Sequence, residues 1–432
     1  MKREPLSRGE KVLAIASVVV VSTILGGGLW LERINAEPKL DFPPVAKRPS
    51  TNGFDVYLRA GQTIRDWAPT VDAASDTEIV TDAKIREQRY GLARRQAWLK
   101  SNAGGFALFE KALTLPCLHP DVRRQSLGQL PDYRDFRSLA RQITARTNTL
   151  KLRGDWNGAA HSGLDSIQMG IDIARGGPIM SKHVGAACAA IGRASLENVP
   201  NRLNSRETTA AARRLEGLIA RRVSYSEALE EEKWAASGQF LLRTRTTAWR
   251  DFVTPRQSLP LWLRLKTVSK TEVVFALIQR IQQAKNELEK PYSSLLPPPE
   301  TNFGAIDLFM EDDYRATRLG YNQAREVTGL NSLLLRFALR AYEAEQGKFP
   351  QTLDELAPKY LKAIPRDVFA DGKPFHYRLE GKAYRLWSVG PDMKNDNGTP
   401  IPREHPLAKD QPWRPIPIRN DSKGDWIAGQ HA

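Results

Sequence analysis

The sequence predicts a mainly α-helical protein with an N-terminal transmembrane helix, an irregular array of helical hairpins and a small C-terminal α+β domain. Three observations support this prediction. An uncharged run of 20 residues lies near the N-terminus. The middle of the chain repeats apolar residues at helical spacing, and alternating strand patterns are confined to roughly the last quarter. A chain of 432 residues is long enough for two or three such domains.

We expect five segments. Residues 1–11 form a cytoplasmic tail, 12–31 a transmembrane anchor, 32–52 a Pro-rich linker, 53–325 a helical domain and 326–432 the α+β domain. Twenty helical residues span about 30 Å, the thickness of a bilayer's hydrocarbon core. Trp30 falls at the end of the run, where an indole ring favours the headgroup interface.

Basic residues are denser before the apolar run than after it. The four that precede it are Lys2, Arg3, Arg8 and Lys11, and those that follow are Arg33, Lys39, Lys47 and Arg48. This bias predicts a cytoplasmic N-terminus and an exported body. A cleaved signal peptide is the alternative, but Ile34-Asn35-Ala36 matches its cleavage pattern poorly. We therefore expect an uncleaved signal-anchor in a bacterial inner membrane, with the bulk of the chain extracytoplasmic.

The linker holds four prolines, which predict an extended, semi-rigid spacer between the membrane and the body. After it, apolar residues recur at helical spacing from Phe136 to Leu150 and again from Ala160 to Ala174, separated by a Gly-Asp turn. Two such stripes predict an antiparallel helical hairpin. Ser224 with Glu227 predicts a capping box at the start of a later helix.

The net charge of +15 and a pI near 9.8 favour anionic partners such as lipid headgroups or an acidic cell-wall polymer. A solvated basic surface is the alternative. Lys and Arg are spread along the chain rather than gathered in one run, so we expect no nucleic-acid partner.

Cys117 and Cys188 could pair in an oxidising compartment or remain as two buried thiols.

No complete catalytic motif is present. The six histidines form no H-E-x-x-H pattern, and the chain holds no phosphate-binding loop and no G-x-S-x-G turn. Carboxylates cluster between Glu227 and Glu232, but a glycosidase needs a second carboxylate across a cleft. A solvated helix face that offsets nearby arginines explains this cluster better. The lack of a complete catalytic motif favours a non-enzymatic role over an enzyme.

The last hundred residues show the most specific pattern. From Asn331 the sequence reads as an amphipathic helix, a Gly-Lys-Phe-Pro break, and a short helix capped by Thr352 and Glu355. Two alternating strands joined by Glu380-Gly381-Lys382 follow, and then an Asn/Asp/Gly loop. This order resembles the C-terminal part of the major pseudopilin of type II secretion systems. The resemblance implies a domain that works outside the cytoplasm and closes its last loop around calcium.

The loop from Ser388 to Gly398 is the candidate metal site. Asp392, Asn395, Asp396 and Asn397 offer the hard oxygen atoms that calcium prefers. Asp425 is similar to the closing segment of the pseudopilin loop, although an insertion from about 400 to 423 separates it from the other four. The alternative is a turn whose backbone is satisfied by its own side chains.

Two further comparisons by resemblance bear on the role of the chain. True pseudopilins carry a Phe after their leader Gly and a Glu four residues later, whereas Glu10 and Ala14 occupy these places here. Pilin-type processing is therefore not expected. The stretch from Leu115 to Pro178 is similar to an uncharacterised family of membrane-anchored bacterial helical proteins.

Three functions remain open from the sequence. The first is a membrane-anchored scaffold that binds other envelope proteins, and the second is a minor component of a type II secretion or pilus-like system. The third is an envelope hydrolase whose site assembles within the helical array.

Overall fold

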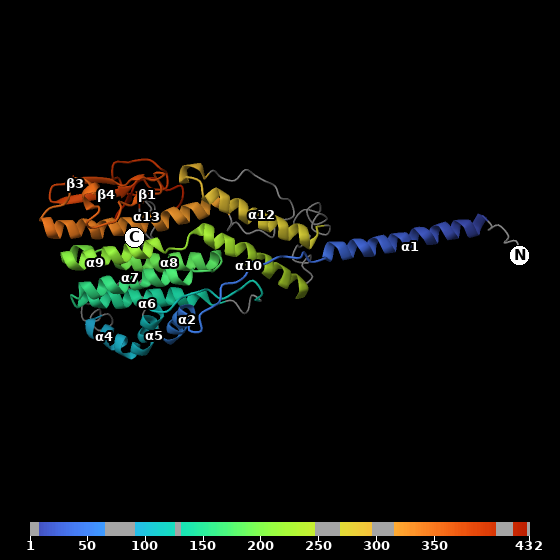
Figure 1. Ribbon diagram of the computed structural model, residues 1–432, viewed down its shortest axis with the longest axis horizontal. Coiled ribbons are helices and arrows are strands. Elements are labelled where there is room, and N and C mark those ends of the chain that lie inside the picture. Colours follow the sequence, from blue (N-terminus) through green and yellow to red (C-terminus); the bar gives the residue numbers. More distant parts are fainter. Residues whose placement is uncertain are drawn as a thin grey trace, which may run out of the picture.

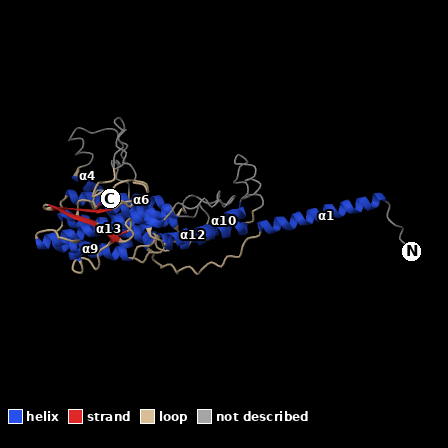
Figure 2. Cartoon of the chain, turned by 90° about the horizontal axis from the view of Figure 1, so that it is seen from above, coloured by secondary structure: helices blue, strands red, loops and turns tan. Residues whose placement is uncertain are grey.

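The computed structural model describes residues 8–64, 91–125, 131–246, 268–295, 315–402 and 418–429. Within these ranges the chain is mainly helical, with one apolar N-terminal helix and two small sheets (Figure 1). The elongated body lies at one end, and the N-terminal helix projects away from it (Figure 2). Parts of the expected tail at 1–11 and of the expected insertion at 400–423 fall outside the described residues.

Helix α1, Arg8–Asn35, contains the predicted apolar run and extends four residues into the expected linker. Its segment Ala16–Asn35 is long and apolar enough to cross a membrane, and almost none of it is buried in the protein. The exposed side chains include Val18, Ile24 and Leu29. By length and composition, the helix can serve as a single-pass anchor or as a signal sequence.

The body consists of helices stacked side by side. They are α2 Gly53–Thr63, α4 Leu92–Ser101, α5 Ala103–Leu113, α6 Tyr133–Leu152, α7 Trp156–Ile173, α8 Ile179–Ser195, α9 Ser205–Ala220, α10 Tyr225–Thr246, α12 Lys270–Leu288 and α13 Ala316–Gln346. Short 3₁₀ turns lie at Pro200–Arg202 (η2) and Tyr292–Ser294 (η4).

Helices α6 and α7 form the predicted hairpin. Gly154 adopts a φ of 75° at its turn, and the Asp155 carboxylate caps α7 by accepting from Gly158 N at 2.8 Å.

Helices α7 and α8 cross at two glycines. A Cβ atom on Gly185 would overlap the carbonyl oxygen of Gly170, and a Cβ on Gly170 would overlap that of Gly185. The backbones approach closely because neither position carries a side chain. This crossing fixes α8 against the centre of the body.

The linker lies against the body rather than standing clear of it as a spacer. Its Glu37 carboxylate pairs with Arg245 near the end of α10 at 2.7 Å, and the Phe42 ring lies 5.9 Å from that of Trp234. The Pro43 carbonyl accepts from Arg123. The sequence showed the extended, Pro-rich character of this segment, but not the charged and aromatic partners that hold it in place.

The C-terminal segment adds a small β unit to helix α13. A 3₁₀ turn, η7 at Leu353–Leu356, begins with the predicted capping box of Thr352 and Glu355. The strands are β1 Arg366–Asp367, β2 Lys373–Pro374, β3 His376–Glu380, β4 Ala383–Ser388 and β5 Trp426–Ile427. Strands β3, β4 and β5 form one antiparallel sheet in that order, and Gly381 turns the β3–β4 hairpin as predicted.

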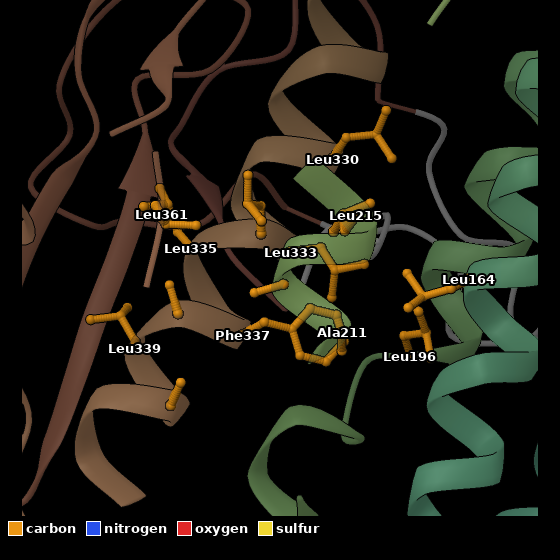
Figure 3. Packing of buried hydrophobic residues seen from close by; sticks show 14 of the residues in the cluster. Leu164, Leu196, Ala211, Leu215, Leu330, Leu333, Leu335, Phe337, Leu339 and Leu361 are labelled. Carbon is orange, nitrogen blue, oxygen red and sulfur yellow. The ribbon is translucent and has the colours of Figure 1, made fainter. Parts of the chain in front are cut away.

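Helix α13 passes straight through the domain boundary that we expected at 325/326. Its residues share one hydrophobic core with α7 and α9 on one side and with the β unit on the other (Figure 3). Phe337 and Leu333 meet Ala211 and Leu215 of α9, while Leu361 of the C-terminal segment belongs to the same cluster. The β unit and the helical body are therefore joined by a continuous core.

Candidate functional site

The predicted metal loop is a series of tight turns. Met393 and Asn397 adopt left-handed backbone conformations, with φ of 60° and 56°. The Asp392 carboxylate accepts from Lys394 N at 3.2 Å. The Asn395 side-chain oxygen accepts from Asn397 N at 3.0 Å and from the Trp387 indole N–H at 3.1 Å. These two acceptors are therefore engaged by the loop's own backbone and by strand β4.

Asp425 closes the loop. The chain returns beside it, with Asp425 N donating to Thr399 O at 2.7 Å and Ile401 N donating to Asp425 O at 3.1 Å. The Asp425 side chain is fully buried, and its carboxylate accepts from Gly398 N at 2.6 Å and from Asp396 N at 3.2 Å. Burial raises the pKa of Asp425, the nearby Asp396 carboxylate raises it further, and the two backbone amides oppose this rise.

The five predicted ligands therefore gather only in part. Asp396 and Asp425 lie close enough for their charges to interact, and carboxylate oxygens keep spare lone pairs after accepting one hydrogen bond. Calcium takes six to eight oxygen ligands. Over the described ranges, no group of three or more His, Cys, Asp or Glu side chains is placed to hold a metal ion. Two carboxylates with backbone carbonyls are the ligands the loop could offer, and calcium binding stays a prediction.

A second buried carboxylate, which the sequence did not reveal, lies under the loop. Asp367 is fully buried and accepts from Ser388 Oγ at 2.8 Å, Phe369 N at 3.0 Å and Val389 N at 3.1 Å. It joins β1 to the end of β4, where the loop begins. Burial raises the pKa of Asp367, and these three donors oppose the rise. The sequence offered only a weak signal for this contact. An Asp side chain can accept from the backbone N–H two residues later in an Asx turn, as Asp367 does from Phe369.

His376 lies near enough to both buried carboxylates to make a small electrostatic contribution to each. Its positive form lowers the pKa of both Asp367 and Asp425, and its ring stacks on Trp387 with centroids 5.3 Å apart. The β unit thus holds a half-buried imidazole within electrostatic range of two buried acids. All three side chains also support the fold, because each contacts the β4 strand or the loop that follows it.

The glutamate cluster of α10 is engaged in packing. Each carboxylate has a partner in the body: Glu227 accepts from Ser224 N, Glu230 pairs with Lys285, Glu231 pairs with Arg123, and Glu232 accepts from Ile179 N. The first of these contacts completes the predicted capping box. Three of the four carboxylates therefore tie α10 to its neighbours, while Glu227 is exposed and Glu230 and Glu231 keep 39% and 34% of their side chains exposed, so the solvated face that the sequence suggested is present in part.

Both cysteines are buried free thiols. Cys117 lies beside α2, and Cys188 lies in α8 with its thiol near the Phe136 carbonyl. Burial raises the pKa of Cys117 well above its ordinary range and that of Cys188 to about 12. The thiols therefore behave as small apolar residues, one of the two outcomes that the sequence left open.

The hollows on the described surface include two that adjoin the linker or α8. One, of about 150 Å³, is roofed by linker residues Pro44 and Val45 and includes the Arg123–Glu231 ion pair. The other is a groove of about 370 Å³ between α6 and α8. Its lining residues are Pro131, Asp132, Tyr133, Arg134, Arg137, Met180, His183, Val184 and Ala187. The second hollow combines aromatic, basic and apolar side chains, the residue types that favour protein contacts.

Comparison of the chain with protein-family models, with curated proteins and with solved structures found no match. The resemblance of the C-terminal residues to pseudopilins therefore stays a prediction from the sequence.

Proposed function

We propose that the chain is a single-pass protein of the bacterial inner membrane, whose body lies outside the cytoplasm and binds other envelope proteins as a scaffold. The observation that carries this proposal is the exposure of α1. Val18 and Leu29 are 65% and 67% exposed, and the residues around them are similarly uncovered. Exposed apolar surface costs roughly 25 cal/mol per Å² in water, so a bilayer is the environment that suits this helix.

The groove between α6 and α8 is the proposed contact surface. Met180 at its edge is 50% exposed, and Arg134 and Arg137 also line it. Arg134 is paired with Asp132 at 2.7 Å, so the flexible apolar side chain of Met180 beside the Arg137 guanidinium is the feature that suits a partly apolar, acidic segment of a partner protein. We propose that the C-terminal β unit, with its pseudopilin-like order of elements, is a second docking module that calcium orders.

A cross-linking experiment tests the scaffold proposal. Membranes carrying the full chain are cross-linked, and the captured proteins are compared between wild type, Met180→Glu and Leu152→Glu. Leu152 is the matched control, because it is an exposed apolar residue at the end of α6 that does not line the groove. We expect Met180→Glu to lose a captured envelope protein that Leu152→Glu retains. Identical capture by the two variants contradicts the groove as the contact surface.

The membrane topology has its own test. A periplasm-dependent reporter fused to the C-terminus is expected to be active in cells, and a cytoplasm-dependent reporter is expected to be inactive. The opposite result contradicts the exported body.

A further inference from the structure

We infer that the ends of α10 and α12 nearest to α1 rest in the headgroup layer of the same bilayer that holds α1. The inference rests on the proposed membrane anchoring and adds a second, peripheral contact to it. The figures show the tips of both helices beside the base of α1, at the end of the body that faces it (Figures 1 and 2). Helix α1 also contacts α12 directly.

The number of residues between the membrane-spanning segment of α1 and Glu37, which forms the first ion pair of the linker, limits how far Glu37 can lie from the hydrocarbon core. The apolar segment ends at Asn35, and Glu37 follows two residues later. Two extended residues reach about 7 Å at most. If the hydrocarbon core ended at Leu31 instead, the four further helical residues would add only about 6 Å. The headgroup layer is itself about 5–8 Å thick on each side of the core. Glu37 therefore lies in this layer if the core ends at Asn35, and at most about 5–8 Å beyond it if the core ends at Leu31.

Glu37 holds the two helix ends at that level. Its carboxylate accepts from Arg245 Nε at 2.9 Å and Nη2 at 2.7 Å, which is the forked geometry of a strong pair. Lys270 Nζ, at the start of α12, lies 3.8 Å from the same carboxylate. Arg245 is in the last turn of α10 and Lys270 is the first residue of α12. Both helix ends are therefore fixed within a few ångströms of Glu37.

The rest of the linker prevents the body from swinging away. Ile34, at the base of α1, is only 5% exposed. Phe42 packs on Trp234, and the Pro43 carbonyl accepts from Arg123 at 2.8 Å. Near the end of the linker, Asn52 donates to Leu118 O at 2.7 Å and accepts from Leu118 N at 3.1 Å. Contacts spread along the whole linker thus hold the body in one orientation to α1.

Several exposed residues at this level suit lipid headgroups, beside the exposed carboxylates Glu32 and Asp41. Arg245 keeps 61% of its side chain exposed. Arg33 is exposed on α1 and Lys39 is exposed on the linker. Trp30, three residues before Arg33 on the membrane side, is 46% exposed. Cationic side chains favour the phosphate level of a bilayer, and Trp favours its interface. The bilayer surface is therefore the occupant that we assign to these helix ends.

Depth-dependent fluorescence quenching of the full chain in lipid nanodiscs tests the inference. A fluorophore is placed on Thr271→Cys, the second residue of α12, and for comparison on Lys348→Cys. Lys348 follows the end of α13 at the far end of the body and is exposed. The two native cysteines are buried, so the label goes to the introduced thiol. We expect lipids with a headgroup quencher to remove more than half of the emission at Thr271→Cys and almost none at Lys348→Cys.

A linker variant and two contrary outcomes complete the test. In Glu37→Gln the carboxylate loses its charge while the contacts of Phe42 and Pro43 remain, so we expect the quenching at Thr271→Cys to fall only in part and to stay above the value at Lys348→Cys. A chain that inserts into nanodiscs but shows equal quenching at both labels overturns this inference alone. A chain that does not insert at all overturns the anchoring as well.

Discussion

The ion pair between Lys182 and Glu326 supports a quantitative prediction. Lys182 Nζ on α8 lies 2.7 and 2.6 Å from the two carboxylate oxygens of Glu326 on α13. Their side chains are 2% and 7% exposed. The same ammonium lies 5.1 Å from the centre of the Tyr225 ring on α10, so one buried cation contacts three helices. Burial lowers the pKa of Lys182, and the Glu326 carboxylate opposes this change.

The perturbation is Lys182→Met, which keeps an unbranched chain and removes the charge. It leaves the Glu326 carboxylate buried without its partner, and such a loss costs about 3–5 kcal/mol of unfolding free energy. Replacing both residues, as Lys182→Met with Glu326→Leu, removes both charges together. Apolar replacements of buried pairs are often neutral or stabilising by about 1–4 kcal/mol. We therefore expect the double variant to be at least as stable as wild type.

Urea unfolding of the full chain in detergent, followed by circular dichroism, measures these differences. The midpoint is expected to fall for Lys182→Met and to recover in the double variant, with little change in the slope of the transition. A loss below about 1 kcal/mol for the single variant would be the value of a surface pair and would refute the burial argument. A double variant as unstable as the single would show that packing, not charge, causes the loss.

Three further predictions follow from single sites. Millimolar calcium is expected to raise the melting temperature of wild type but not of Asp425→Asn, and an unchanged wild type contradicts the metal loop. Burial lowers the pKa of His119 from 6.5 to about 4. Between these two pH values the His119 ring therefore binds a proton more readily in the unfolded chain than in the folded protein. Stability is expected to fall by up to about 3 kcal/mol as the pH drops through this window, and His119→Gln should lose this dependence in urea titrations. Gly185→Ala is expected to lose about 1–3 kcal/mol in thermal unfolding because its Cβ would overlap Gly170 O. Gly217→Ala, facing open space on α9, is expected to gain up to about 1 kcal/mol, and equal effects contradict the close crossing.

Local signals in the sequence were sufficient for much of the helical architecture. The α6–α7 hairpin followed from apolar spacing on either side of Gly154, whose positive φ the turn requires. The capping boxes at Ser224 and Thr352 were visible as residue pairs three apart. Each of these features depends on residues within a few positions of one another, which is the range over which helical spacing and capping act.

Contacts between distant segments left no comparable signal. Glu37 and Arg245, which fix the linker, are 208 positions apart, and Glu231 and Arg123 are 108 apart. A charged residue in the sequence has many possible partners, and only the packed helices select one. In the candidate site, the sequence pointed to Asp425 because its segment resembles the closing segment of the pseudopilin loop. Asp367 was not predicted, because a possible Asx turn is too common a pattern to single it out.

Helix α13 shows why the C-terminal residues are not an independent unit. The sequence from Asn331 predicts an amphipathic helix, which has a single apolar face. The residues from Thr328 to Leu339 are all buried instead. A helix that is buried on every side needs neighbours on every side, even where it carries polar residues such as Asn331 and Arg336. The apolar run Leu333–Leu335 followed by Phe337 already indicates that more than one face is buried. The β unit covers one side and α9 the other, so the C-terminal residues and the helical body share one hydrophobic core.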